Sequence, residues 1–386
     1  MSCSTYRRTA TSIAALAVAA TLPLHAQSST QASTDSTPKL TFGAFVDGYF
    51  AWDFGRPPAL DRSFVGGTVF TTQPSRHNEF NVNLAYVETK IDAPHYRGRL
   101  ALQAGTSVQS NYAGEPTKGT ISGPNLARML QEAVVGVKLA DNVWVDAGIF
   151  YSHIGTESWA SRDNPTYTRS LIADYTPYYQ SGVKFTWTPN TKLTAQLDIV
   201  NGWQNISENN SGKGAGLRLD YAADANTTIS YFNLVSSEAT SRLRIFNGLG
   251  VKRAMGKLSV VAEADVGSQS RGANANGQST WYGWTAIARI QATPTVALVA
   301  RVEGYDDKDQ VIVATGSYVA STKTVANPAL QAIGGSFGVD VTPYARVTWR
   351  TEVRGWGNKN ALFPNGLTGA PQKSSTLAVT SLSLTF

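Results

Sequence analysis

The chain lacks paired cysteines, long hydrophobic runs and a strong excess of one charge. Its one cysteine, Cys3, lies near the start of the sequence, so no disulfide can hold the fold together and packing and backbone hydrogen bonds must do so. After residue 26, no hydrophobic run approaches the ~18 residues that a membrane-spanning helix requires. Any segment of this chain that crosses a membrane must therefore be a β-strand.

Charge and composition exclude further classes of protein. The 33 basic and 27 acidic residues give a formal net charge of +6, with no basic block and no interleaving of basic and aromatic residues. We therefore expect no nucleic-acid partner. With 34 Gly, 16 Tyr, 14 Phe and 9 Trp the chain is too aromatic to be disordered, and at 42% hydrophobic residues it is too polar for a helical membrane protein.

Histidine is also scarce, which bears on catalysis. Beyond the N-terminal segment the chain has only His77, His95 and His153, and none stands in an HxxxH, HExxH or GxSxG context. No ligand spacing typical of a metal site and no phosphate-binding glycine loop is present. We expect no catalytic residues, no metal and no cofactor, and hence no enzyme.

What the sequence does contain is a two-residue period at its C-terminal end, residues 375–386. Leu382 and Leu384 alternate with Ser381 and Ser383, and the chain stops on Phe386. This alternation predicts a strand with one apolar and one polar face. The pattern resembles the C-terminal signature of bacterial outer-membrane β-barrels, in which the last strand pairs with the first. The alternative is an edge strand of a soluble sandwich, which would expose an aggregation-prone edge.

The N-terminal segment agrees with export. Residues 1–26 combine Arg7 and Arg8, an apolar stretch over 13–24 and a small residue at Ala26, as in a secretory signal peptide of the Sec pathway. Leu24 is unusual three residues before a cleavage site, so cleavage after Ala20 remains an alternative. Residues 27–39 form a Ser/Thr-rich flexible linker. We therefore assign the folded domain to residues 40–386.

Sixteen amphipathic segments follow the linker. An even number suits a barrel whose termini lie on one side of the membrane, and short connections alternate with long ones as in outer-membrane barrels. We predict an all-β protein, a transmembrane antiparallel up-and-down β-barrel of about 16 strands, with 14 to 18 as the range. The segments lie near 40–53, 77–91, 97–110, 131–140, 143–152, 177–188, 191–202, 212–223, 226–235, 243–254, 257–268, 280–292, 295–306, 329–342, 345–356 and 375–386.

A near-repeat indicates which side chains face the interior. Three segments, starting at Trp187, Ala292 and Val341, each place a Thr-Pro turn before an alternating strand with an acidic residue. In the third segment the apolar parity is Val347, Trp349, Thr351 and Val353. The opposite parity is charged and predicts a water-filled lumen. The pore-lining candidates on this parity and its neighbours are Arg289, Arg301, Glu303, Arg346, Arg350, Glu352 and Arg354.

Two roles are open for these charges. Several arginines on one wall predict a modest bias toward anions, because the glutamates between them partly neutralise the wall. Alternatively, each is a paired charge that only keeps the wall rigid and hydrated. Ten aromatic residues near strand ends are expected in the headgroup zone: Tyr49, Trp52, Trp144, Tyr151, Trp187, Trp203, Trp281, Trp284, Tyr344 and Trp356.

Two long connections are candidates for segments inside the barrel. In residues 114–131, Pro124 precedes a stretch, 125–131, that we expect to form two helical turns and to narrow the lumen. The second connection, 151–179, contains a Gly-x-Glu, an Asp-Asn and a Tyr-x-Arg-Ser-Leu before an aromatic-rich return strand. This pattern, over Tyr151 to Trp187, resembles the OmpL-like group of bacterial β-barrel porins. The resemblance implies an inward-folded loop at the constriction containing Glu157, Arg162, Asp163, Asn164, Tyr167, Arg169 and Ser170.

The resemblance implies a porin in the outer membrane of a Gram-negative-type bacterium. We expect a water-filled channel for the passive diffusion of small polar solutes or ions, in contact with outer-membrane lipid and lipopolysaccharide. The alternative is a structural or adhesion barrel with a plugged lumen, whose loops bind a partner. Whether the chain forms a homo-oligomer such as a trimer, and which solute it carries, stay open.

Overall fold

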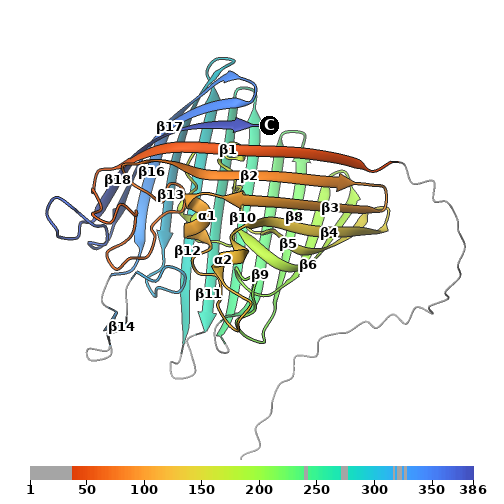
Figure 1. Ribbon diagram of the computed structural model, residues 1–386, viewed down its shortest axis with the longest axis horizontal. Helices are drawn as coiled ribbons and strands as arrows, with labels where there is room; N and C mark the ends of the chain where they lie inside the picture. The colour runs from red at the N-terminus through yellow and green to blue at the C-terminus, as the bar shows by residue number, and fades with distance from the viewer. Residues whose placement is uncertain (1–36, 239–241, 271–276, 316–317, 320–323, 326–327) are drawn as a thin grey trace, which may run out of the picture. The chain divides into compact units, whose positions relative to one another are not determined.

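Sixteen strands close into one barrel in a computed structural model that describes residues 37–238, 242–270, 277–315, 318–319, 324–325 and 328–386 (Figure 1). Each strand pairs antiparallel with its neighbours in sequence, and the barrel closes where β1 pairs with β18. The predicted fold class and strand number are confirmed. The strands are β1 Lys39–Asp53, β2 Phe80–Asp92, β3 Tyr96–Ala104, β4 Leu130–Ala140, β5 Val143–Tyr151, β6 Tyr179–Asn190, β7 Leu193–Val200, β8 Gly214–Asp224, β9 Thr227–Glu238, β10 Arg242–Met255, β11 Leu258–Ser270, β12 Gln278–Gln291, β13 Val296–Asp306, β16 Gln331–Tyr344, β17 Val347–Asn358 and β18 Ser374–Thr385.

The remaining elements are short and lie in the connections. A two-stranded hairpin, β14 Tyr318–Val319 with β15 Thr324–Val325, stands apart from the barrel sheet. The helices are α1 Thr106–Asn111, α2 Pro124–Ala127, the 3₁₀ turn η1 Ser161–Asp163 and α3 Leu171–Asp174. Among the described residues, no helix has the length and apolar character needed to span a membrane.

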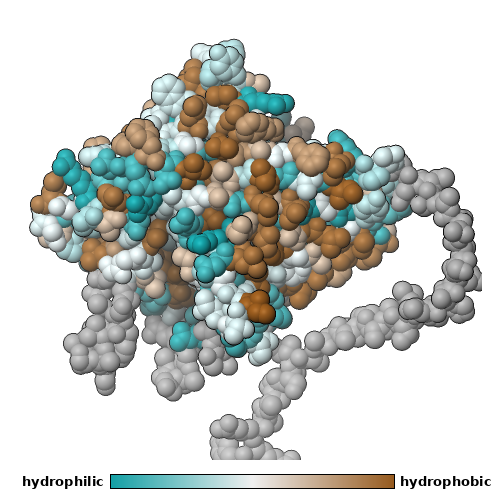
Figure 2. Space-filling model, in the orientation of Figure 1, coloured by the Kyte–Doolittle hydropathy of each residue, from teal (hydrophilic) through white to brown (hydrophobic). Residues whose placement is uncertain are grey.

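The two-residue period of the strands separates an outer from an inner face. In β18, Leu382 is 59% exposed whereas Ser381 is 3% exposed, as the alternation predicts. On β17, Trp349 and Val353 are likewise exposed, while Arg350, Glu352 and Arg354 of the opposite parity are buried. Figure 2 shows hydrophobic side chains spread over the outer wall at β1 to β4. An apolar outside is the surface that hydrocarbon requires.

Turn lengths alternate between the two ends of the barrel. One end has connections of two to four residues, such as 141–142, 191–192 and 345–346, and the other carries the loops 54–79, 105–129, 152–178, 201–213, 307–330 and 359–373. We call 152–178, which joins β5 to β6, the inner loop. The predicted alternation of short and long connections is confirmed except between β9 and β10, where three residues join the strands.

Three details of the sequence-based assignment were wrong. The strand expected over 97–110 ends at Ala104, because Gly105 has a φ of 139° and a Cβ there would overlap the Asn83 carbonyl, and α1 follows. The two helical turns expected over 125–131 shrink to the single turn α2, because β4 begins at Leu130. Arg346 lies in the exposed turn before β17 and not on the strand. The expected signal peptide, 1–26, lies outside the described residues.

Candidate functional site

The inner loop folds against inward-facing side chains around the barrel wall. The Ser161 hydroxyl donates to Asp47 on β1 at 2.9 Å, and the Thr156 N–H donates to Glu263 on β11 at 2.6 Å. The His153 ring lies 2.7 Å from the main-chain carbonyl of Asn233 on β9. Because β1 and β9 are separated by half of the closed sheet, contacts to both place the loop inside the barrel.

Arg350 on β17 holds the middle of the inner loop through its main chain. Its guanidinium donates to the carbonyl oxygens of Ser161, Asn164 and Thr166 at 2.6, 2.8 and 3.1 Å. It also lies 3.1 Å from the Asp340 carboxylate on β16. Such charge-assisted bonds to backbone are stronger than neutral ones. One wall arginine therefore fixes the path of six consecutive loop residues.

A buried ionic quartet lies beside this anchor. Arg301 and Glu303 on β13 and Glu352 and Arg354 on β17 are almost inaccessible to solvent. Arg354 lies 2.7 Å from Glu303, and Arg301 lies 3.0 Å from Glu352. Charges removed from water are costly unless their hydrogen bonds are satisfied. The quartet meets this condition partly by bonding to the inner loop.

The loop supplies the missing partners of the quartet. The N–H and hydroxyl of Thr168 donate to the Glu352 carboxylate at 2.8 and 2.9 Å, and the Leu171 N–H donates to Glu303 at 2.7 Å. Arg301 in turn donates to the Thr168 carbonyl at 2.7 Å. The strand charges and the loop thus complete one hydrogen-bond network, so the loop and the wall depend on each other for stability.

The other site residues predicted from the sequence differ in how much of their side chains solvent reaches. Arg289 pairs with Asp340, Glu157 accepts bonds from Ser170, and Arg169 lies 3.7 Å from the ring of Tyr178. Arg346 in its turn and Asp163 in η1 are exposed, and Arg162, Glu157 and Arg289 are partly exposed.

A continuous hydrophobic cluster fills the space between the loops and the wall. The aromatic side chains of Tyr49, Trp281 and Trp356 point inward and are nearly fully buried in it, so their expected position in the headgroup zone was wrong. The cluster joins inward residues of many strands to Ile154, Leu171 and other loop residues. By their position in the alternation, these aromatic side chains share the inner, charged face of the strands. They are stable there because the loops pack against them and exclude water.

Inward-facing glycines leave the space into which side chains of the inner loop pack. This role was not identified from the sequence. A Cβ at Gly216 on β8 would overlap the His153 ring, and one at Gly250 on β10 would overlap the Thr156 side chain. Glycine in a strand interior often marks a place where another segment approaches closely. Glycines at inward positions of strands could have indicated where a long loop packs against the wall.

A polar, water-accessible strip remains on the wall from β2 to β6. Arg97 pairs with Asp146 at 2.5 Å, and Arg99 pairs with both Glu88 and Glu132. This strip borders a cavity of about 280 Å³ that is also lined by Lys90 and Lys184. The Arg162 guanidinium faces the same side, 5.3 Å from the Phe45 ring and 5.4 Å from the Tyr86 ring.

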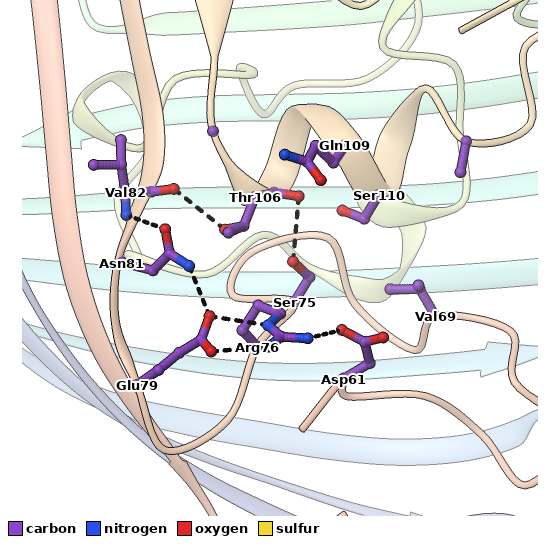
Figure 3. A pocket seen from close by; sticks show the side chains of 12 residues that line it. Asp61, Val69, Ser75, Arg76, Glu79, Asn81, Val82, Thr106, Gln109 and Ser110 are labelled. Atoms are coloured by element: carbon purple, nitrogen blue, oxygen red, sulfur yellow. Dashed lines mark hydrogen bonds and ion pairs between the residues drawn. The ribbon is translucent and has the colours of Figure 1, made fainter. Parts of the chain in front are cut away.

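A second cavity, of about 650 Å³, lies between loop 54–79, the start of β2 and α1 (Figure 3). Arg76 bridges Asp61 at 2.6 Å and Glu79 at 2.8 Å across its floor. None of the residues predicted from the sequence lines it. The described residues contain no group of three or more His, Cys, Asp or Glu side chains arranged for a metal ion.

The closed sixteen-strand sheet, the apolar exterior and the inward-folded loop define a β-barrel of the outer-membrane porin class. The chain belongs to the family described as "Putative beta-barrel porin-2, OmpL-like", whose model matches residues 39–386. The family resemblance drawn from the sequence is confirmed. Comparison with curated proteins gives no match.

Solved structures share the fold at low sequence identity. The anion-selective porin from Comamonas acidovorans matches with a TM-score of 0.54 and 11% identity, covering 90% of this chain and 100% of that one. OmpT of Vibrio cholerae in its trimer form gives 0.56 and 7%, covering 91% and 100%. The channel DcaP of Acinetobacter baumannii gives 0.55 and 10%, covering 90% and 97%.

Proposed function

We propose that the protein is a passive channel for small polar solutes or ions across the outer membrane of a Gram-negative bacterium. The observation that carries this proposal is the charged strip on β2 to β6, because its cations stay partly accessible to water inside the barrel, whereas the quartet of Arg301, Glu303, Glu352 and Arg354 is buried. Lys90 is 41% exposed and Arg97 is 34% exposed in their side chains. Hydrated wall charges at this position support an aqueous passage.

The passage would run between this strip and the tip of the inner loop. Asp163 is 53% exposed in its side chain and, with Arg162, offers charges to a passing solute. On this proposal the predicted site residues take two different roles. Arg162 and Asp163 line the passage, whereas Arg301, Glu303, Arg350, Glu352 and Arg354 determine its width by holding the inner loop.

Selectivity would be weak. Arg97, Arg99 and Lys90 each pair with a carboxylate, so the strip presents both signs of charge to a solute. The neighbour from Comamonas acidovorans is described as anion-selective, and a modest preference for anions fits the cations of this strip. Solutes would cross by diffusion with no catalytic step and no cofactor.

Export and assembly complete the proposal. We propose that the Sec pathway exports the chain by means of residues 1–26 and that the barrel contacts outer-membrane lipid and lipopolysaccharide. One structural neighbour, OmpT, is described in a trimer form, which supports a homo-oligomer such as a trimer here. Crosslinking of the protein in native membranes, followed by denaturing electrophoresis, measures the oligomeric state.

Planar-bilayer recording of the purified protein tests the channel. We expect stepwise current increases and a steady open current in salt solution. A deletion of residues 161–166, which removes the tip of the inner loop, should raise the conductance because it widens the passage. A protein that inserts, judged by protease protection, but carries no current would contradict the proposal.

A second function is favoured by the hydrophobic cluster. Phe64 and Phe70 of loop 54–79 pack with Phe363 of loop 359–373, and Phe70 lies 4.7 Å from the Trp356 ring on the wall. Apolar packing of this kind suits a plugged structural or adhesion barrel. Absence of current in the intact protein, together with binding of a partner to its loops, would favour this second function.

A further inference from the structure

Two neighbouring carboxylates on β11 are buried in the interior without a counter-ion. Glu263 and Asp265 share the inward face of the strand and are 5% and 7% exposed. Asp265 lies two residues from Glu263 on the same face of the strand. Among the described residues, neither carboxylate forms an ion pair, in contrast to Glu303, Glu352 and Asp340. Burial of two like charges without compensation is strongly unfavourable.

Several oxygen atoms at this point lack a hydrogen-bond partner. They are Oε1 of Glu263, both carboxylate oxygens of Asp265 and the hydroxyl oxygen of Thr156. Thr156 belongs to the inner loop, is only 7% exposed, and its N–H donates to the other Glu263 oxygen at 2.6 Å. A third side chain, contributed by a separate segment, therefore lies beside Glu263.

Two basic side chains, Arg218 and Lys252, lie near Glu263 without forming an ion pair with it, and Arg218 is engaged elsewhere. Arg218 on β8 donates to Asp220 at 2.7 Å and to the carbonyls of His153 and Gly155 at 2.8 and 2.9 Å. The surroundings of Asp265 are tight, because a Cβ on Gly248 would overlap its carboxylate. Little room therefore remains beside Asp265 for a further protein side chain.

We propose that Glu263, Asp265 and Thr156 form a binding site for a hard divalent cation of the Ca²⁺ type. A set of ligands made only of oxygen atoms selects such ions over softer transition metals. Two carboxylates neutralise the charge of one divalent ion. With three protein side chains, water would supply the remaining ligands. The bound ion would join the start of the inner loop to β11 and so stiffen the loop on the N-terminal side of its Arg350 anchor.

Terbium luminescence tests the site directly, because Tb³⁺ replaces Ca²⁺ at oxygen sites and is excited by a nearby indole. The Trp281 ring packs against Gly267, two residues from Asp265 on the same face of β11. We expect the chelator-treated, folded protein in detergent to bind Tb³⁺ saturably with excitation in the tryptophan band, and Ca²⁺ to displace it. Asp265→Asn and Glu263→Gln should each weaken binding by about tenfold or more.

An exposed carboxylate provides the matched control. Asp141 lies in the turn after β4 with a fully exposed side chain, so Asp141→Asn should leave Tb³⁺ binding unchanged. Thermal unfolding gives a second measurement that does not depend on luminescence. Ca²⁺ should raise the unfolding temperature of the parent protein and of Asp141→Asn, but not that of Asp265→Asn.

Two results would overturn the proposal. One is Tb³⁺ binding that stays the same in Asp265→Asn and Glu263→Gln, which would place the ion on surface carboxylates. The other is a folded parent protein that binds no Tb³⁺ and gains no stability from Ca²⁺, which would mean that the two carboxyl groups share a proton instead. Neither result depends on whether the barrel conducts.

Discussion

The guanidinium of Arg350 lies 2.6 Å from the main-chain carbonyl oxygen of Ser161, although the two residues are 189 positions apart in sequence. Arg350 sits on β17 and Ser161 begins η1 in the inner loop, so this bond joins the wall to the segment that crosses the interior. A basic residue on the inward face of a strand is thereby used to position backbone and not to meet a solute.

The first prediction follows from that bond. Arg350→Ser removes three hydrogen bonds to the loop and leaves Asp340 without one of its two cations, so we expect a loss of about 3 kcal/mol or more in unfolding free energy. We also expect a larger and noisier bilayer current, because the loop tip is released. Arg346→Ser is the matched control and should change stability by less than about 0.5 kcal/mol. Equal effects of the two variants would mean that Arg350 does not anchor the loop.

The second prediction tests which side chains face lipid. Val353 lies on the exposed outer face of β17, so Val353→Arg should lower the stability of the folded barrel by about 2 to 4 kcal/mol, the cost of a cation near the bilayer midplane. Thr348→Arg, on the inner face of the same strand, should be tolerated. Reversible unfolding in lipid vesicles measures both, and an equal loss in the two variants would contradict the assigned faces.

The third prediction concerns closure of the barrel. The N–H of Phe386 donates to the Ala44 carbonyl on β1 at 2.9 Å, beside the Phe45 to Thr385 pair. We expect deletion of Phe386 to reduce the yield of folded protein in the outer membrane much more than deletion of one residue in loop 359–373. Quantitative immunoblotting of outer-membrane fractions measures the yield. A normal yield without Phe386 would argue against a role in assembly.

The fourth prediction concerns ion selectivity. Replacing Arg99 with Gln leaves Glu88 and Glu132 without their shared cation, so the reversal potential should move toward cation preference. The shift should be larger at low salt, because the Debye length is about 8 Å at 0.15 M and grows on dilution. The double variant Arg346→Ser, Arg350→Ser serves for comparison, because the sequence predicts that these two arginines control selectivity. A change of reversal potential in the double variant but not in Arg99→Gln would contradict the fourth prediction and assign ion selectivity to β17.

The fifth prediction concerns pH and loop 54–79. The Nδ1 of His77 accepts a hydrogen bond from the Asp53 N–H at 2.9 Å. Burial lowers the pKa of His77, opposed by Asp53 and reinforced by Arg62 and Arg56. The folded state thus favours neutral His77, so its contribution to stability is present above the unfolded pKa of about 6.5 and is lost as the pH falls below it.

Limited proteolysis of loop 54–79 measures this effect. We expect faster cleavage at about pH 5 than at about pH 7.5 in the parent protein. His77→Gln cannot gain a proton in this range and should show a much smaller difference. A pH dependence that is the same in both proteins would mean that another group controls the loop.

The barrel itself was predictable because each strand carries its own signal. Alternation of apolar and polar residues is a local property, and by itself it assigns Leu382 and Leu384 to the outer face and Ser381 and Ser383 to the inner face. Short turns such as 345–346 separate the strands in the same way. The resemblance over Tyr151 to Trp187 added the family, which the match over residues 39–386 confirms.

The interior was not predictable to the same degree, because it depends on contacts between segments far apart in sequence. Parity shows that Arg301 and Arg354 point inward, but it cannot distinguish an arginine that meets water from one that meets a buried glutamate. That difference arises only when the inner loop brings Thr168 against Glu352. The sequence alone determined the number of strands, most of their bounds and their outward faces, since these follow from local alternation and turn residues. Only the tertiary structure decided which inward charges stay hydrated, since that depends on where the long loops pack.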